Sequence, residues 1–325
     1  MTTTIKALLH ASLLSFCAAT GLAAQAQTYP SKPVTVIVPF PPGAGVDIVT
    51  RLVMAKLATT LNQPFVIENR SGAGGNVGAA EAARAAPDGY TLLATPSSIA
   101  VSQTLYKNLP FSLEKDFRAV GMMASVPFIL AVNPGVPAKS VADLVELAKA
   151  KPDTLTFAST GNGSSPHLTA EMFKMDAKIS LRHVPYRGSG PAMNDLMSGQ
   201  VDMMFANALS VLPQIQSGRL RALAITSTAA NPSVPGVPTM QQAGVAGFES
   251  ETWFALLAPA DTPAPVVERL NAELNRVMKM PDVQQTLAAQ AATARSGTPA
   301  EVDAYIKKET ARFAEIIKVS GTHIE

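Results

Sequence analysis

The segment at residues 34–61, VTVIVPFPPGAGVDIVTRLVMAKLATTL, joins an apolar run to a helical pattern through a loop rich in proline and glycine. The run Val34–Val38 has the character of a buried strand, and residues 47–61 carry apolar side chains at helical spacing. The prolines stiffen the loop, while Gly43 and Gly45 permit a sharp turn. Such a turn leaves free backbone N–H groups beside the positive end of the helix dipole, where anions bind. The segment therefore predicts an α/β fold with an anion site at this turn; the alternative is a stiff turn that holds no ligand.

Four further glycine- or serine-rich loops recur along the chain, at residues 71–75, 95–98, 159–165 and 186–190. Most lie between an apolar run and a helical pattern, and this alternation favours parallel-rich sheets flanked by helices. In such sheets ligands bind beyond the carboxyl ends of the strands, where these loops are expected. We therefore predict that several turns converge on one cleft that binds a small carboxylate.

The alternation starts afresh at residues 127–133, and a strand at 252–258 is followed by helices up to residue 319. Both features fit two lobes joined by two crossing segments. Lobe 1 then comprises residues 27–126 and 251–325, and lobe 2 comprises residues 127–250. Two helix starts are marked locally: Ser140 is a predicted N-cap, and residues 298–301, TPAE, form a predicted capping box.

The N-terminus has the three parts of a secretory signal. Lys6 supplies the positive charge, residues 7–19 are largely apolar, and a small-residue cleavage site ends at Ala26. We expect residues 1–26 to be removed on export to a periplasmic compartment; the alternative is a buried or membrane-anchoring helix. The one cysteine, Cys17, lies in this segment, so the mature chain is expected to have no disulfide, thiol nucleophile or cysteine-bound metal.

Charge and spacing exclude several other functions. Loss of Lys6 changes the formal net charge from +2 to +2 − 1 = +1, and no clustered cations indicate nucleic acid or an anionic membrane as a partner. The glycines near residue 43 lack the third glycine of a dinucleotide site, and no P-loop ending is present. His167, His183 and His323 show no metal-ligand spacing. No metal and no cofactor are therefore expected.

A serine hydrolase is an alternative, because Ser164 and Ser165 lie close to His167. Neither serine has the flanking glycines of a nucleophile elbow, and a catalytic serine and its base normally meet through the fold rather than along the chain. His167 is better interpreted as a hydrogen-bonding or packing group. For Arg187 two readings stay open, a bidentate clamp on a carboxylate or a link between the backbones of the two lobes.

Six stretches together carry a family resemblance: YPSKPV (29–34), PFPPGAGVD (39–47), ENRSGAGG (68–75), PDGYTLL (87–93), STGNGS (159–164) and VPYRG (184–188). From residue 29 to about residue 322 the chain resembles the periplasmic solute-binding proteins of tripartite tricarboxylate transporters, often called the Bug or TctC-like family. The resemblance implies a type 2, Venus-flytrap binding protein with two lobes. It implies a monomeric, non-enzymatic receptor that captures a small organic acid and delivers it to membrane transporter subunits.

In that family the loop matching residues 39–47 reaches a ligand carboxylate through bridging waters and main-chain groups, and three further loops contact the ligand from both lobes. This chain has Gly43-Ala44-Gly45 where many members have Gly-Gly-x, which alters the loop locally. Asp47 is a candidate cap for the helix after this loop. The expected ligand-binding residues are Phe40, Pro42, Gly43, Gly45, Asp47, Ser97, Ser98, Thr160, Gly161, Asn162, Gly163, Ser164, His167, Tyr186, Arg187, Gly188 and Asn207.

The identity of the ligand is left open by the sequence. Mono-, di- and tricarboxylates, amino acids, aromatic acids and vitamins such as nicotinate all remain candidates. A ligand-presenting partner of a signalling receptor is an alternative to a transport role.

Overall fold

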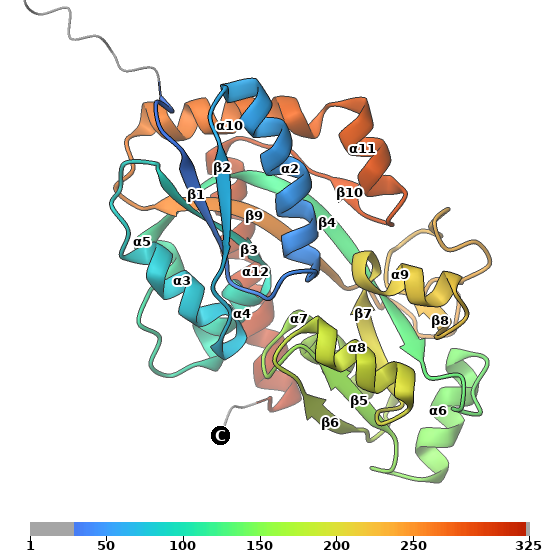
Figure 1. Cartoon of the computed structure of the whole chain (residues 1–325). Helices are drawn as coiled ribbons and strands as arrows, with labels where there is room; N and C mark the ends of the chain where they lie inside the picture. The colour runs from blue at the N-terminus through green and yellow to red at the C-terminus, as the bar shows by residue number, and fades with distance from the viewer. Residues whose placement is uncertain (1–28, 323–325) are drawn as a thin grey trace, which may run out of the picture. The chain divides into compact units, whose positions relative to one another are not determined.

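The computed structural model describes residues 29–322 (Figure 1). It contains two groups of three strands, and the strands within each group run parallel to one another. The first group is β1 (Val34–Val38), β2 (Phe65–Asn69) and β3 (Thr91–Pro96). The second group is β5 (Thr156–Ser159), β6 (Arg182–Pro185) and β7 (Met203–Asn207). The predicted signal at residues 1–26 lies outside the described residues. No helix in the described part of the chain has the length and apolar character needed to cross a bilayer.

Two long strands connect these groups and run antiparallel to their neighbours. The sheet order is β2-β1-β3-β9-β4-β7-β5-β6, in which β9 is Glu251–Pro259 and β4 is Phe117–Val132. β4 pairs with β9 as far as Pro127, and from Phe128 onward with β7 and with β8 (Arg221–Ile225). The short β10 (Thr293–Ala294) also pairs with β4. The sheet is therefore mixed, with parallel pairing inside each group and antiparallel pairing where the chain crosses.

The lobe boundary predicted at residue 127 coincides with the change of partner along β4, and the one predicted at residue 251 coincides with the start of β9. We propose that the lobes divide at these two positions. The prediction of a fresh strand at 127 was incomplete, however. β4 already begins at Phe117 and runs without a break into the second group, as Figure 1 shows.

The three helices whose starts the sequence predicts, near residues 47, 140 and 298, begin within two residues of those positions. The helices that follow a strand of either group are α2 (Gly45–Leu61), α3 (Asn76–Ala83), α4 (Ser98–Leu105), α7 (Ser165–Ala177), α8 (Ser189–Ser198) and α9 (Ala208–Gln216). The others are η1 (Ala73–Gly75), α5 (Leu113–Asp116), α6 (Val141–Ala150), α10 (Ala264–Met278), α11 (Pro281–Ala288) and α12 (Pro299–Ser320). The predicted cap at Ser140 and the capping box at Thr298 are both confirmed.

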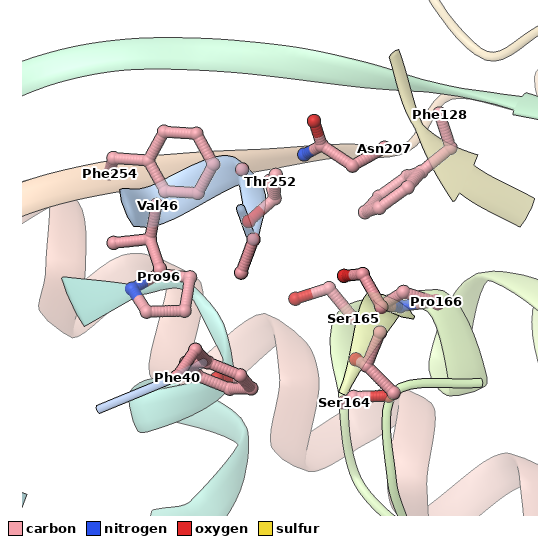
Figure 2. A pocket seen from close by; sticks show the side chains of 15 residues that line it. Phe40, Val46, Pro96, Phe128, Ser164, Ser165, Pro166, Asn207, Thr252 and Phe254 are labelled. Atoms are coloured by element: carbon pink, nitrogen blue, oxygen red, sulfur yellow. The ribbon is translucent and has the colours of Figure 1, made fainter. Parts of the chain in front are cut away.

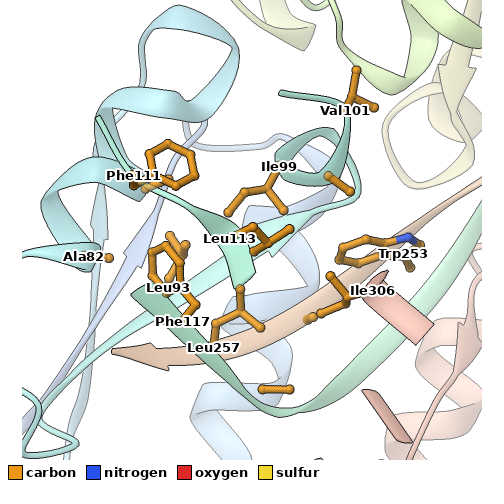
Figure 3. Close-up of a cluster of buried hydrophobic side chains, with 14 of the residues drawn as sticks. Ala82, Leu93, Ile99, Val101, Phe111, Leu113, Phe117, Trp253, Leu257 and Ile306 are labelled. Atoms are coloured by element: carbon orange, nitrogen blue, oxygen red, sulfur yellow. The ribbon is translucent and has the colours of Figure 1, made fainter. Parts of the chain in front are cut away.

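Two separate hydrophobic cores support the two strand groups. The first contains Leu93, Phe117, Trp253, Leu257 and Ile306 (Figure 3). Each such side chain stabilises the fold by about 1.5–3 kcal/mol when it is fully buried. The second core is built on aromatic contacts among residues 173, 205 and 248, whose ring centroids lie 5.6–6.4 Å apart. Two cores on one continuous sheet account for a two-lobed α/β fold.

Candidate ligand-binding site

Five helices that begin at the carboxyl ends of strands contribute their starting residues to one small cavity of about 50 Å³ (Figure 2). The contributing residues are Gly45 and Val46 of α2, Ser98 of α4, Ser164 and Ser165 at the start of α7, Ser189 of α8, and Asn207, the N-cap of α9. The first backbone N–H groups of a helix have no acceptor within that helix. The positive ends of five helix dipoles therefore converge on one space. We call this space the helix-terminus cavity.

No ionised side chain of residues 29–322 lines the helix-terminus cavity. The remaining lining residues are Phe40, Ala44, Pro96, Phe128, Thr160, Pro166, Thr252 and Phe254. In Figure 2, Phe40, Pro96 and Phe254 lie on one side of it, and Ser164 and Asn207 on the other. The hydroxyl of Ser164 is buried and has no hydrogen-bond partner among the residues that the structure describes. Such a group is costly unless a partner is supplied, which a bound acid in this cavity would do.

At the β1–α2 junction (residues 39–47) a buried carboxylate holds the loop. The Gly43 N–H donates to Asp47 Oδ2 at 2.9 Å, and Arg51 Nε donates to the same oxygen at 2.9 Å. Asn69 Nδ2 donates both to Asp47 Oδ1 and to the carbonyl of Phe40, each at 2.9 Å. Burial acts to raise the pKa of Asp47, but these hydrogen bonds outweigh it and hold that pKa below its usual value. Asp47 lies within the first turn of α2 rather than at its N-cap, and its carboxylate is directed at the loop.

At the β5–α7 junction (residues 159–167) the neutral imidazole of His167 holds the loop, as the carboxylate of Asp47 does at the β1–α2 junction. The Gly163 N–H donates to His167 Nδ1 at 3.1 Å. The ring of His167 stacks on that of His183 at 3.9 Å, and His183 in turn stacks on Phe157 at 4.7 Å. His183 Nε2 lies 2.7 Å from the hydroxyl of Ser159. The stack therefore fixes both ends of the loop between β5 and α7.

Burial keeps both histidines neutral. It lowers the pKa of His167 to about 3, with help from His183 and Lys174, and the pKa of His183 to about 4, with help from Lys174. The approach of His167 Nε2 to Glu171 Oε1 at 3.7 Å is therefore not an ion pair at neutral pH.

The hydrolase alternative has no matching geometry in the described residues. No hydrogen bond joins His167 to Ser164 or Ser165, and His167 Nδ1 is occupied by the Gly163 N–H. The hydroxyl of Ser165 instead lies 2.8 Å from that of Ser97.

Three close contacts join the two strand groups around the cavity. The hydroxyl of Ser97, at the start of α4, lies 2.8 Å from that of Ser165 and 3.0 Å from that of Thr252 on β9. A Cβ at Gly45 would lie 2.8 Å from Asn207 Oδ1, so a larger residue there would displace the Asn207 side chain. A Cβ at Gly188 would likewise lie 2.9 Å from a side-chain carbon of Pro41. The junctions therefore meet directly.

A second cavity of about 520 Å³ adjoins the first, since Phe40 and Thr160 line both. Arg187 lines this second space, which we call the Arg187 cavity, and it forms no ion pair with any residue in the described part of the chain. The hydroxyl of Tyr186 donates to Asp195 Oδ2 at 2.7 Å, and burial together with this bond raises the pKa of Tyr186 to about 12. The other lining residues are Pro39, Pro41, Ser71, Gly72, Ala73, Gly74, Gly75, Tyr106, Gly161 and Asn162.

The structure brings ten of the seventeen expected residues to these two cavities. Those at the helix-terminus cavity are Phe40, Gly45, Ser98, Thr160, Ser164 and Asn207, and those at the Arg187 cavity alone are Gly161, Asn162, Tyr186 and Arg187. Seven expected residues line neither cavity: Pro42, Gly43, Asp47, Ser97, Gly163, His167 and Gly188. Of these seven, Gly43, Asp47, Gly163 and His167 hold the two loops in shape. Phe128, Thr252 and Phe254 also line the helix-terminus cavity but were not predicted, because they lie on crossing strands and no loop motif marks them.

Comparison with known proteins gives consistent matches over nearly the whole chain. Residues 49–322 match the family model described as the tripartite tricarboxylate transporter family receptor. Protein BugT of Bordetella pertussis is 38% identical over 314 residues, which is 95% of this chain and 96% of BugT.

Two solved structures with bound acids are also similar. Rpa4515 of R. palustris with adipate has a TM-score of 0.88 and 33% identity, with 91% of this chain and 99% of that chain covered. MatC from Rhodopseudomonas palustris with bound malate has a TM-score of 0.84 and 33% identity, with 89% and 100% covered.

Proposed function

Because the chain belongs to the tripartite tricarboxylate transporter family of receptors, we propose that it is a solute-binding protein that captures a small organic carboxylate for a membrane transporter. It acts in the periplasm after cleavage near Ala26, as a monomer and without catalysis. Delivery is to a tripartite tricarboxylate-type transporter. The adipate and malate bound by similar proteins support a carboxylate as the class of ligand.

One observation carries the proposal: five helix N-termini meet at a cavity whose lining, in the described part of the chain, includes no ionised side chain. A carboxylate there receives backbone and hydroxyl hydrogen bonds in place of a counter-ion. This arrangement suits a ligand that must bind firmly and still be released, since no salt bridge has to be broken.

The energies are sufficient for useful affinity. Each helix terminus contributes about 0.3–1 kcal/mol to a neighbouring anion, and each hydrogen bond to a charged oxygen contributes about 1.5–3 kcal/mol. Several of each exceed the roughly 8 kcal/mol that corresponds to micromolar binding, from which desolvation and ordering costs subtract. Contacts between the two strand groups such as Ser97–Ser165 would then mark the loaded state for the transporter.

A thermal-shift screen of organic acids against the purified mature protein tests the proposal. An acid at a hundred times its dissociation constant is expected to stabilise the fold by about 2.7 kcal/mol. Sugars and divalent metal ions are the controls. A response to a sugar or a metal with none to any carboxylate would contradict the proposed function.

A further inference from the structure

Helix α7 has buried apolar side chains on two opposite faces. Ala170 and Phe173 are fully buried in the second core, as expected for a helix that follows β5 of the second strand group. Leu168 is also buried, with 1% of its surface exposed, but it belongs to the first core. With about 3.6 residues per turn, Leu168 and Ala170 point about 200° apart around the helix axis. A helix needs only one apolar face to pack on its own sheet, so Leu168 makes a different contact.

The first core otherwise consists of residues from lobe 1. Among the residues that the structure describes, its buried members lie at positions 37–122 or 253–317, with Leu168 as the exception. They include Val101 and Leu105 of α4 and Ile306 of α12, and α7 packs beside α12 (Figure 1). A leucine from lobe 2 therefore fills a place in the hydrophobic core of lobe 1. We call this the Leu168 contact.

The first turn of α7 couples the Leu168 contact to the helix-terminus cavity. Ser165 lines that cavity, its hydroxyl lies 2.8 Å from that of Ser97, and Leu168 follows within the same helical turn. A Cβ at Gly163 would lie 2.1 Å from Leu105 Cδ2, so the loop before α7 packs directly on α4. One turn of a helix moves as a unit, because its hydrogen bonds join residues four apart. The cavity therefore cannot widen between Ser97 and Ser165 unless Leu168 is withdrawn from the first core.

Withdrawal of Leu168 exposes apolar surface to water, which is unfavourable in proportion to the area exposed. The contact does not depend on a bound acid, since Leu168 lines neither the helix-terminus cavity nor the Arg187 cavity. It therefore favours the closed arrangement of the lobes with and without a ligand.

From these observations we propose that the Leu168 contact holds the two lobes closed over the helix-terminus cavity before any acid binds. Leu168 is a positioning residue: it touches no ligand, but its burial raises the fraction of the ligand-free receptor that is already closed. The apparent dissociation constant varies inversely with that fraction, so the contact strengthens binding from outside the site. The proposal rests on the lobe boundaries at residues 127 and 251 and does not depend on the identity of the ligand.

Spin labels on the two lobes test the inference in the ligand-free mature protein. Val66 on β2 and Asn194 on α8 are exposed, and the sequence after residue 26 contains no cysteine. Val66→Cys and Asn194→Cys therefore place one label on each lobe. By double electron–electron resonance we expect one distance population when Leu168 is present, and a second, longer population that exceeds the first in Leu168→Ala. Identical distance distributions in the two proteins overturn the inference.

The matched control is Leu144→Ala on α6, because Leu144 is fully buried in the second core and loses the same side-chain atoms. Its distance distribution is expected to equal that of the protein with both leucines. A longer population of the same size in both alanine variants would show general loosening of the fold and overturn the inference. Leu168→Val removes less volume and is expected to give a smaller longer population. If Leu168→Ala does not fold, an unchanged distribution in Leu168→Val overturns the inference instead.

Calorimetry with adipate and malate measures the consequence for binding. For either acid that binds, we expect Leu168→Ala to bind about tenfold more weakly than Leu144→Ala, or weaker still. Equal affinities of the two variants overturn the effect on binding and leave the proposed function intact. A protein that binds no carboxylate contradicts the proposed function, while the distance distributions still decide whether Leu168 holds the lobes closed.

Discussion

The β1–α2 and β5–α7 junctions hold their loops in a fixed shape through hydrogen bonds to two different side chains. In each a glycine with positive φ, Gly43 at 81° or Gly163 at 73°, donates its N–H to a side chain four residues later in the chain. That acceptor is an ionised carboxylate at Asp47 and a neutral imidazole at His167. The shared geometry indicates that a fixed loop shape is what the cavity requires.

The difference lies in what surrounds each acceptor. Asp47 is bonded to Arg51 and Asn69, so its charge is compensated within its own junction. His167 lies in a stack of rings and keeps its role only while it carries no extra proton. The two junctions are therefore expected to respond differently to added bulk, loss of charge and acid.

The largest expected contrast follows from adding one methyl group to each glycine. Both Gly43→Ala and Gly163→Ala strain a left-handed backbone position, at a cost of about 1–2 kcal/mol. At Gly163 the new Cβ would also lie 2.1 Å from Leu105 Cδ2 on α4, whereas nothing lies within 4 Å at Gly43. We expect Gly163→Ala to lower the free energy of unfolding by about 1–3 kcal/mol more than Gly43→Ala does, in denaturant titrations, because overpacking costs about that amount. Equal free energies of unfolding would show that Leu105 adjusts without cost.

Removing the charge of the first junction is expected to have the next largest effect. Asp47→Asn keeps the shape of the side chain but turns an amide toward the donors that the carboxylate accepts from. The free energy of unfolding should fall by about 1.5–3 kcal/mol, the worth of hydrogen bonds to a charged group. Arg51→Gln is the control, and about 1 kcal/mol or less is expected because the Arg51 side chain is half exposed. If both variants lose the same amount, the ion pair rather than the bond to Gly43 holds the loop.

The two junctions are expected to lose their contributions to stability at different pH values. The ordinary pKa of histidine, 6.5, falls to about 3 at His167 and about 4 at His183, so the unfolded chain binds protons in this range that the folded chain does not. The contribution of these two neutral histidines to the free energy of unfolding is therefore present in full above pH 6.5 and declines as the pH falls toward 4. For Asp47, whose folded pKa is lowered, the contribution is lost only at a pH below the ordinary value of 3.8.

Denaturant titrations between pH 7 and pH 4.5 measure this decline. His167→Asn removes one titrating ring and offers Oδ1 to the Gly163 N–H. The His167→Asn substitution should reduce the slope of the free energy of unfolding against pH by up to about 1.4 kcal/mol per pH unit. A slope identical to that of the wild-type protein would show that the stacked pair does not resist protonation.

The smallest expected effect concerns the start of α7. Ser165→Ala removes the 2.8 Å contact with Ser97, which keeps its bond to Thr252 at 3.0 Å. The free energy of unfolding should fall by about 0.5–1.5 kcal/mol, as for one neutral hydrogen bond. Exposed Ser217→Ala, which loses only local bonds to Gln214 and Arg219, provides the baseline. A loss as large as that of Asp47→Asn would show that the neutral hydrogen bond at Ser165 stabilises the fold as much as the charged hydrogen bonds at Asp47.

Local signals in the sequence predicted the helix starts and the loops of the site. Proline, glycine and capping residues act over three or four positions, so Ser140 and Thr298 could be assigned without knowledge of the rest of the chain. The first part of β4 was missed because its residues show no alternation and include Gly121 and Pro127. Its pairing with β9 depends on a segment more than a hundred residues away.

The site was predictable in its loops but not in its details. A pattern of residues does not reveal that the carboxylate of Asp47 turns back toward Gly43, or that His167 meets His183 from another strand. Phe128 and Thr252 reach the cavity only because β4 and β9 cross beside it. These placements are set by tertiary packing and leave no mark on neighbouring residues.

The chain contains one tryptophan, Trp253, and it is fully buried on β9 directly after the cavity residue Thr252. Its ring contacts that of Tyr305 edge-on at 6.1 Å, and its Nε1 has no hydrogen-bond partner within residues 29–322. Excitation at the red edge of indole absorbance therefore reports on this strand alone. The emission wavelength and lifetime of the unlabelled protein therefore give an optical readout of β9, the strand that also carries the cavity residue Thr252.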